Sequence, residues 1–196
     1  MAPRKNSKNN SKAPAKKPAA RRSRPQYVEP LHKEVVCTYR TIEGNANAIG
    51  MTVACRPDTD AGGVTAAPLW SLLSSRYDEY RVKMYVIDII CEQSDRPAFS
   101  VIDRIASVMN DPSHFMRDRN HRLHSLTSDN KKVTLMWKAQ TSSDNDFRST
   151  EANTVAAAVP SYMHFLQTGL ADAAPKVEVR TKCYVEMRGE KKVYPQ

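Results

Sequence analysis

The segment 176–188, with the sequence KVEVRTKCYVEMR, constrains the fold more than any other part of the chain. Apolar and charged residues alternate along its length, so an extended conformation sorts them onto two opposite faces. A helix would scatter the same side chains around its axis. The pattern therefore predicts a long half-buried strand with one wet face. Its apolar register consists of Val177, Val179, Thr181, Cys183, Val185 and Met187.

Two further segments, 131–139 and 80–91, have the same character. The second begins by alternating and then becomes apolar on both faces. That change predicts a central strand with one end buried on both sides, or a β-bulge. The residues expected to point inward are Val133, Leu135 and Trp137 in the first segment, and Val82, Met84 and Val86 in the second.

Weaker patterns complete the expected architecture. Strands are predicted over 34–42, 48–55, 97–103, 121–127 and 155–168, the last with an edge or break at Pro160. Helices are predicted over 67–80, with Leu69, Leu72, Leu73 and Tyr77 on one side, and over 111–119, with Asp111 as cap and Pro112 at the first position. These elements predict an all-β fold, an eight-stranded antiparallel jelly-roll sandwich with one or two short helices.

The first 25 residues differ sharply from the rest of the chain. They hold four prolines, nine cations and no acid, and their apolar side chains are alanines and one methionine. Such a segment has almost nothing to bury against the entropy of ordering. The whole chain has 30 Lys and Arg against 21 Asp and Glu, so the chain without the nine arm cations is neutral. We predict a disordered basic arm over residues 1–26 and one globular domain over 27–196.

The arm has the composition of a nucleic-acid-binding tail. Without aromatic residues or regular spacing it cannot read bases, but it can neutralise phosphates and release counterions with a steep salt dependence. The stretch 16–25, KKPAARRSRP, also looks like a nuclear import signal. The predicted nucleic-acid-binding residues are Arg4, Lys5, Lys8, Lys12, Lys16, Lys17, Arg21, Arg22 and Arg24.

Several function classes lack support. We find no apolar run long enough to span a bilayer and no secretory signal, so no membrane partner is expected. There is no Gly-rich phosphate loop, no GxSxG and no marked Ser, His and Asp set, so no catalytic residue and no enzyme is predicted. The four cysteines, which are expected to be buried reduced thiols, are Cys37, Cys55, Cys91 and Cys183.

Metal sites have weak support. His121 and His124 would point to opposite faces of a strand and could not share an ion. Asp58 and Asp60 offer two oxygen donors in one loop; a solvated turn is the default, and a calcium site shared with a neighbouring subunit is the alternative. Asp144 and Asp146 have the same ambiguity. No cofactor is therefore expected, apart from this candidate structural calcium.

The aromatic residues fit a core better than a base-stacking surface. Tyr77, Tyr80, Tyr85 and Tyr162 lie mostly in apolar or helical contexts.

An ordered set of segments resembles the coat proteins of small icosahedral viruses. The set comprises SRYDEYRVKMYVIDI, PAFSVIDRIAS, HSLTSDNKKVTLMWKA and VEVRTKCYVEMRGEKK, after a basic arm rich in Pro and Asn. They are similar to segments of circular, Rep-encoding single-stranded DNA viruses, and size and layout also resemble satellite tobacco necrosis virus. The second segment departs from the family at Ile105 and Ala106, where an acidic residue is common.

The resemblance implies a jelly-roll capsid protein that assembles with itself into a small shell, a T=1 shell of 60 copies being favoured by the short chain. It implies a packaged single-stranded genome, DNA rather than RNA, and a virion location. Assembly in the host nucleus with the import machinery is implied for DNA, and in the cytoplasm otherwise. Loops 56–66, 92–97 and 139–153 are predicted subunit contacts or exterior surface. A non-viral nucleic-acid-binding β-barrel module with a basic tail, and an enzyme on a jelly-roll scaffold, remain the alternatives.

Overall fold

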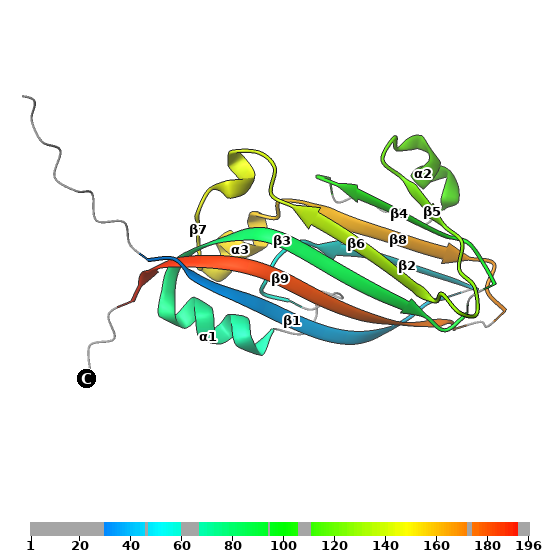
Figure 1. The fold of residues 1–196 in the computed structure, drawn as a ribbon, viewed down its shortest axis with the longest axis horizontal. Coiled ribbons are helices and arrows are strands. Elements are labelled where there is room, and N and C mark those ends of the chain that lie inside the picture. Colours follow the sequence, from blue (N-terminus) through cyan, green and yellow to red (C-terminus); the bar gives the residue numbers. More distant parts are fainter. Residues whose placement is uncertain are drawn as a thin grey trace, which may run out of the picture.

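A computed structural model of the chain describes residues 30–45, 47–59, 67–93, 95–105, 111–171 and 174–191. Two antiparallel sheets face each other and enclose one main core (Figure 1). Sheet A has the order β1 (His32–Glu43), β9 (Lys176–Glu190), β3 (Tyr77–Cys91) and β6 (Lys132–Lys138), with β7 (Arg148–Ser149) beside β3. Sheet B has the order β2 (Ala48–Ala54), β8 (Tyr162–Thr168), β4 (Ala98–Asp103) and β5 (Arg122–His124).

The strand order is that of a jelly roll. Strands from opposite ends of the chain are neighbours: β1 pairs with β9, and β2 pairs with β8. Each sheet contributes four strands in this order, and these eight strands confirm the predicted fold class. The two-residue strand β7 is an addition to them. Because both pairings join distant parts of the chain, neither sheet is complete until nearly the whole domain has been made.

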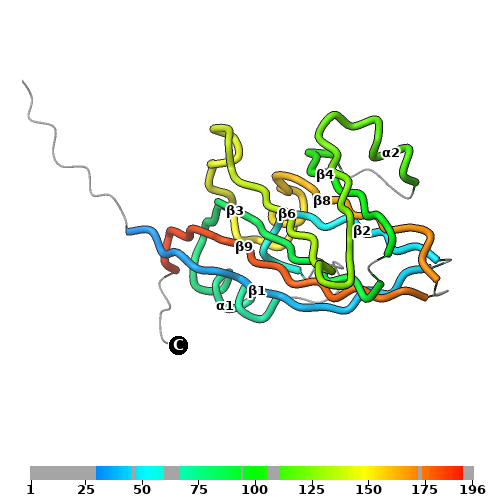
Figure 2. Tube along the Cα trace, turned by 45° about the vertical axis from the view of Figure 1, so that its right-hand side comes forward, coloured from blue at the N-terminus to red at the C-terminus, as the bar shows by residue number. Residues whose placement is uncertain are grey.

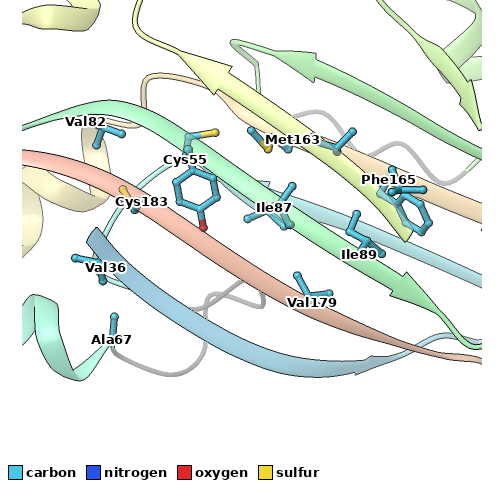
Figure 3. Packing of buried hydrophobic residues seen from close by; sticks show 14 of the residues in the cluster. Val36, Cys55, Ala67, Val82, Ile87, Ile89, Met163, Phe165, Val179 and Cys183 are labelled. Carbon is cyan, nitrogen blue, oxygen red and sulfur yellow. The ribbon is translucent and has the colours of Figure 1, made fainter. Parts of the chain in front are cut away.

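Strand β9 supplies the core as its alternation predicts. The six residues of its apolar register are all buried, none with more than 2% of its surface exposed. Figure 3 shows Val179 and Cys183 among residues from the facing sheet, such as Met163 and Phe165. Along β6, Val133 and Leu135 are likewise buried, and Trp137 packs against the core while staying half-buried.

A β-bulge in β3 changes which residues reach the core. The register of β3 against β9 shifts between Val82 and Met84. Val82 is buried, but the next buried residues are Tyr85, Ile87, Ile89 and Cys91. The prediction that Met84 and Val86 face inward is therefore wrong, because one extra residue moves the alternation to the other face. The bulge itself was one of the two predicted alternatives.

The helix before β3 is shorter than predicted. Helix α1 (Pro68–Arg76) ends where β3 begins, so Tyr77 to Tyr80 belong to the strand. Both tyrosines are buried, and Tyr80 pairs with β9 and β7, which a helix would not allow. The predicted inner face is also partly wrong: Trp70 and Leu73 are buried, whereas Leu72 is 64% exposed.

Other boundaries differ from the predicted ones. Only the second half of the predicted strand 155–168 is a strand, β8. Its first residues belong to helix α3 (Ala152–Ala157), and the chain around Pro160 is neither helix nor strand. The predicted strand 121–127 is paired only over the three residues of β5. Helix α2 (Pro112–Arg117) forms as expected, with the Asp111 carboxylate accepting a hydrogen bond from Ser113 N–H at 2.7 Å. A 3₁₀ turn, η1 (Ser143–Asn145), was not predicted.

Helix α2 covers part of the outer side of sheet B. Phe115 packs with Phe99, Val101 and Leu166 in a second, smaller cluster. On the same side of β8, the fully buried His164 accepts a hydrogen bond from the Thr52 hydroxyl at Nδ1 (2.9 Å) and donates from Nε2 to a backbone carbonyl (3.3 Å). Burial lowers its pKa, although the nearby carbonyl of Ile105 and the charges of Asp103 and Asp118 oppose the shift.

His164 makes the fold sensitive to acid. The pKa of a histidine in the unfolded chain is about 6.5, and that of His164 is lower in the native state, so the unfolded state takes up the proton first. Above a pH of about 6.5, this group should not affect the free energy of unfolding. At lower pH the free energy of unfolding should decrease, by at most about 1.4 kcal/mol per pH unit. Urea unfolding between pH 7.5 and 5 measures the slope, which should be shallower in His164→Gln.

A second histidine serves as a comparison for that slope. Burial also lowers the pKa of His124, so His124→Gln should likewise flatten the dependence. An identical slope in the native chain and His164→Gln would contradict the assignment.

Val179→Asp should prevent folding, because it places a carboxylate without a partner in the fully buried inner face of β9. We expect a loss above about 4 kcal/mol and insoluble expression. The matched control is Lys182→Asp, which introduces the same residue on the exposed face of the same strand and should cost under about 1 kcal/mol. Equal solubility of the two variants would show that this register is wrong.

Candidate nucleic-acid interface

The nine predicted arm cations all lie outside the described residues. Connectivity nevertheless places the arm's point of attachment. Pro30, the first described residue, leads into β1, and His32 pairs with Met187 near the end of β9. In Figure 2 the beginning of β1 and the end of β9 lie side by side at one end of sheet A. The arm is therefore joined to that end of the sandwich.

Ring stacking holds the beginning of β1 in place. The His32 ring stacks on Tyr77, with 5.2 Å between ring centroids and planes 14° apart. Tyr77 is the first residue of β3, directly after α1. The attachment point of the arm is thus fixed against the beginning of β3, by this stacking, and against β9, by strand pairing.

The exposed face of sheet A is charged but neutralises itself. Oppositely charged side chains meet across neighbouring strands or, for Arg180 and Glu178, along β9 itself, and these pairs contribute little stability where they are exposed. Their effect is to keep the local field weak, in agreement with a neutral body. The pairs include Lys33 and Arg81 with Glu186, Lys132 with Asp88, Lys176 with Glu43, Arg180 with Glu178, and Arg188 with Glu79.

The predicted contact loop 139–153 is built around a buried carboxylate. Asp144, only 6% exposed, accepts hydrogen bonds from the backbone N–H groups of Thr141 (3.0 Å) and Gln140 (3.2 Å) and from Arg104 (3.3 Å). Burial alone would raise its pKa, but these donors together lower it. Asp144 is thus the anchor of a turn, and its Oδ2 oxygen accepts from all three donors.

The same loop is fastened to sheet A by an aromatic ring. The guanidinium carbons of Arg81 and Arg188 lie 4.5 Å and 4.0 Å from the centre of the Phe147 ring. Farther along, the Thr150 hydroxyl donates to the Tyr77 carbonyl at 2.8 Å. The loop therefore presents a well-defined surface, as a subunit contact requires.

The structure describes only one of the two carboxylates of the candidate calcium site, that of Asp58. Asp60 lies outside the described residues. The Asp58 oxygen Oδ1 lies 3.0 Å from Arg56 Nε, a charge contact without the angles of a hydrogen bond. Burial raises the Asp58 pKa, and the Arg56 charge opposes this. An ion-paired carboxylate is a poor calcium ligand, and no cluster of three metal-ligating side chains exists within the described ranges.

Two other sequence interpretations have clear outcomes. Cys55, Cys91 and Cys183 are buried thiols, and burial raises the pKa of Cys91 to about 12. Cys37 corrects the prediction that all four are buried, because it lies on the exposed side of β1. Tyr77, Tyr80 and Tyr85 belong to the core as predicted, and Tyr162 is half-buried.

A cavity of about 610 Å³ opens between the two sheets at the edge formed by β6, β4 and β5. Sequence reasoning identified Trp137 as inward-facing but missed the cavity that it lines. No signal along the chain could reveal it, because its walls come from segments far apart. Its walls include Trp137, Lys138, Arg122, Arg104, Asn120 and Gln140.

Comparisons with known proteins bear on the fold. No family model and no curated protein sequence matches the chain. Solved structures do match. The BFDV capsid protein in its 60-mer form has a TM-score of 0.59 at 12% identity, over 86% of this chain and 98% of that one. The chain has the jelly-roll fold of viral capsid proteins.

Other capsids share this fold with comparable agreement. The particle of the giant freshwater prawn Macrobrachium rosenbergii nodavirus has a TM-score of 0.57 at 11% identity, over 88% of this chain and 100% of that one. Cocksfoot mottle virus has 0.56 at 13%, over 83% and 97%. The capsid resemblance is thus confirmed in the fold, and these neighbours are viral coats rather than enzymes. No helix in the described part of the chain is long and apolar enough to cross a membrane.

Asp144→Asn should loosen the 139–153 loop of this capsid fold. All three donors bind Oδ2, so an amide oxygen at that position keeps them, but the hydrogen bonds lose the negative charge of their acceptor, at a cost of about 1 kcal/mol. Chemical denaturation measures the loss, and limited proteolysis should show faster cleavage within the loop. Asp146→Asn, two residues away in the same loop, is the matched control. Equal effects of both changes would remove the anchoring role of Asp144.

Proposed function

We propose that the chain is the capsid protein of a small icosahedral virus, which assembles with itself into a closed shell and packages a single-stranded genome through its basic arm. The observation that carries this proposal is the combination of a capsid jelly roll with a charge distribution in which the entire excess lies in residues 1–25.

The charge distribution suits a container for a polyanion. Subunits that must pack against each other benefit from a neutral, self-paired surface, because long-range repulsion between them is small. The genome needs compensating cations inside. Sixty copies, the number in the matched BFDV particle, would supply roughly 540 arm charges, enough for a large share of a genome of about one to two kilobases.

We further propose a DNA genome and a T=1 shell. The matched segments lean towards circular single-stranded DNA viruses, and 16–25 could serve nuclear import, so assembly in the host nucleus follows. An RNA genome would place assembly in the cytoplasm. With either genome, the protein would be found in the virion, with no membrane partner.

The principal alternative is a nucleic-acid-binding β-barrel module with a basic tail. It would remain a monomer or small oligomer. Negative-stain electron microscopy of the purified full chain distinguishes the two: closed spheres roughly 17–25 nm across support the capsid. Small particles at every salt, pH and calcium concentration tried would overturn it.

Packaging should depend on the charge of the arm. With the nine arm cations replaced by Gln, we expect shells that contain far less nuclease-protected nucleic acid, because the remaining body is neutral. The ratio of absorbance at 260 and 280 nm of purified shells measures this content.

The control for that experiment keeps the charge of the arm and changes its sequence. An arm in which Lys and Arg are exchanged for each other should package normally, since phosphate neutralisation needs no particular sequence. Native nucleic-acid content in shells of the Gln variant would contradict the arm's role while leaving the shell itself established.

A further inference from the structure

The cavity between the sheets exists because the edge of sheet B is short. Strand β5 has three residues, whereas β6 on the facing edge of sheet A has seven. Along β6, Val133 and Leu135 are buried in the core, whereas Trp137 is half-buried and lines the opening. Between the sheets this leaves an opening of about 610 Å³, within the range typical of small-molecule sites.

The indole of Trp137 is a free aromatic wall of this cavity. It packs against the main core and also lines the opening. Among the described residues nothing accepts a hydrogen bond from its N–H, and the ring remains half-buried. A tryptophan with one side supported by the core is a rigid platform on which a planar ring can stack.

Two cations in the walls of the cavity are without counterions among the described residues. Arg122 and Lys138 line the cavity, and neither forms an ion pair with any residue that the structure describes. The exposed face of sheet A is different, since its cations are largely paired. A third cation, Arg104, is engaged by Asp144 at 3.3 Å, and the remaining wall carboxylate, Asp103, accepts from the Arg104 backbone N–H.

We propose that this cavity binds a nucleoside phosphate, with the base on Trp137 and the phosphate at Arg122 and Lys138. The amide side chains of Asn120 and Gln140, also in the walls, can meet the polar edge of a base. The ligand has two sources: one nucleotide of the packaged strand, which rests on the proposed function, or a free nucleotide.

The lining favours this ligand over simpler ones. An apolar molecule would leave the two cations without a counterion. An inorganic anion would not stack on the indole and would fill only a small part of the volume. A base that stacks on an aromatic residue gains about 1–3 kcal/mol, and a phosphate gains charge-assisted hydrogen bonds from Arg and Lys. Stacking tolerates every base, so we infer little sequence preference.

Tryptophan fluorescence tests the site in the full chain. The chain has two tryptophans, and the other, Trp70, is 6% exposed and in edge-on contact with Tyr80. Titration with deoxyadenosine monophosphate should quench the emission with saturation, and Trp137→Phe should abolish the quenching. Inorganic phosphate should compete without quenching. Absence of saturable quenching in the native chain, or its persistence in Trp137→Phe, overturns the proposal.

A matched pair of double variants tests the cations. Arg122→Gln with Lys138→Gln should weaken nucleotide affinity at least tenfold. Arg119→Gln with Lys131→Gln removes the same charge from exposed positions outside the cavity and should change affinity less than twofold. Equal weakening in both pairs would mean a general charge effect and no site. Circular dichroism verifies that each variant is folded.

Two further measurements separate the sources and the proposals. A tetranucleotide of thymidine that quenches more tightly than the mononucleotide identifies a strand, whereas quenching by the mononucleotide alone identifies a free nucleotide. Microscopy of the same preparations reports on the shell. Filled shells without Trp137 quenching would refute the cavity inference alone, and saturable quenching without shells would refute the capsid proposal alone.

Discussion

The pairing of β9 between β1 and β3 is the interaction on which the rest of the structure depends. It joins the first and last strands of the described chain along the whole of β1, from His32 to Glu43. The inner face of β9 supplies six core residues, and on its outer face Glu186 and Arg188 pair with charges of the neighbouring strands. One strand therefore organises the core and also keeps the surface of sheet A neutral.

This division of charge connects the fold to the proposed function. A body whose charges pair locally can approach copies of itself closely, while its basic arm meets a polyanion. The arm is joined to the body where His32 stacks on Tyr77, next to the end of β9. The cavity at the opposite edge of sheet A departs from the pattern, since Arg122 and Lys138 stay unpaired there among the described residues. That exception is what makes the cavity a candidate ligand site.

Sequence patterns predicted the strands that alternate without interruption, such as β9 and β6, because one period-two pattern sorts the side chains of the whole strand. They failed where contacts with distant residues changed the local outcome. In β3 the bulge after Val82 moved Met84 and Val86 to the outer face. At the end of α1, pairing with β9 and β7 drew Tyr77 to Tyr80 into a strand despite a helical pattern.

The sequence by itself determined the jelly-roll class, the core face of β9 and the confinement of excess charge to the first 25 residues, because alternation and composition are properties of contiguous residues. Only the tertiary structure decided the bulge, the anchoring of loop 139–153 by Asp144 and Phe147, and the cavity beside Trp137. The physical reason is that each of these depends on side chains brought together from distant segments. Their meeting is set by sheet pairing and strand length, which no local pattern encodes.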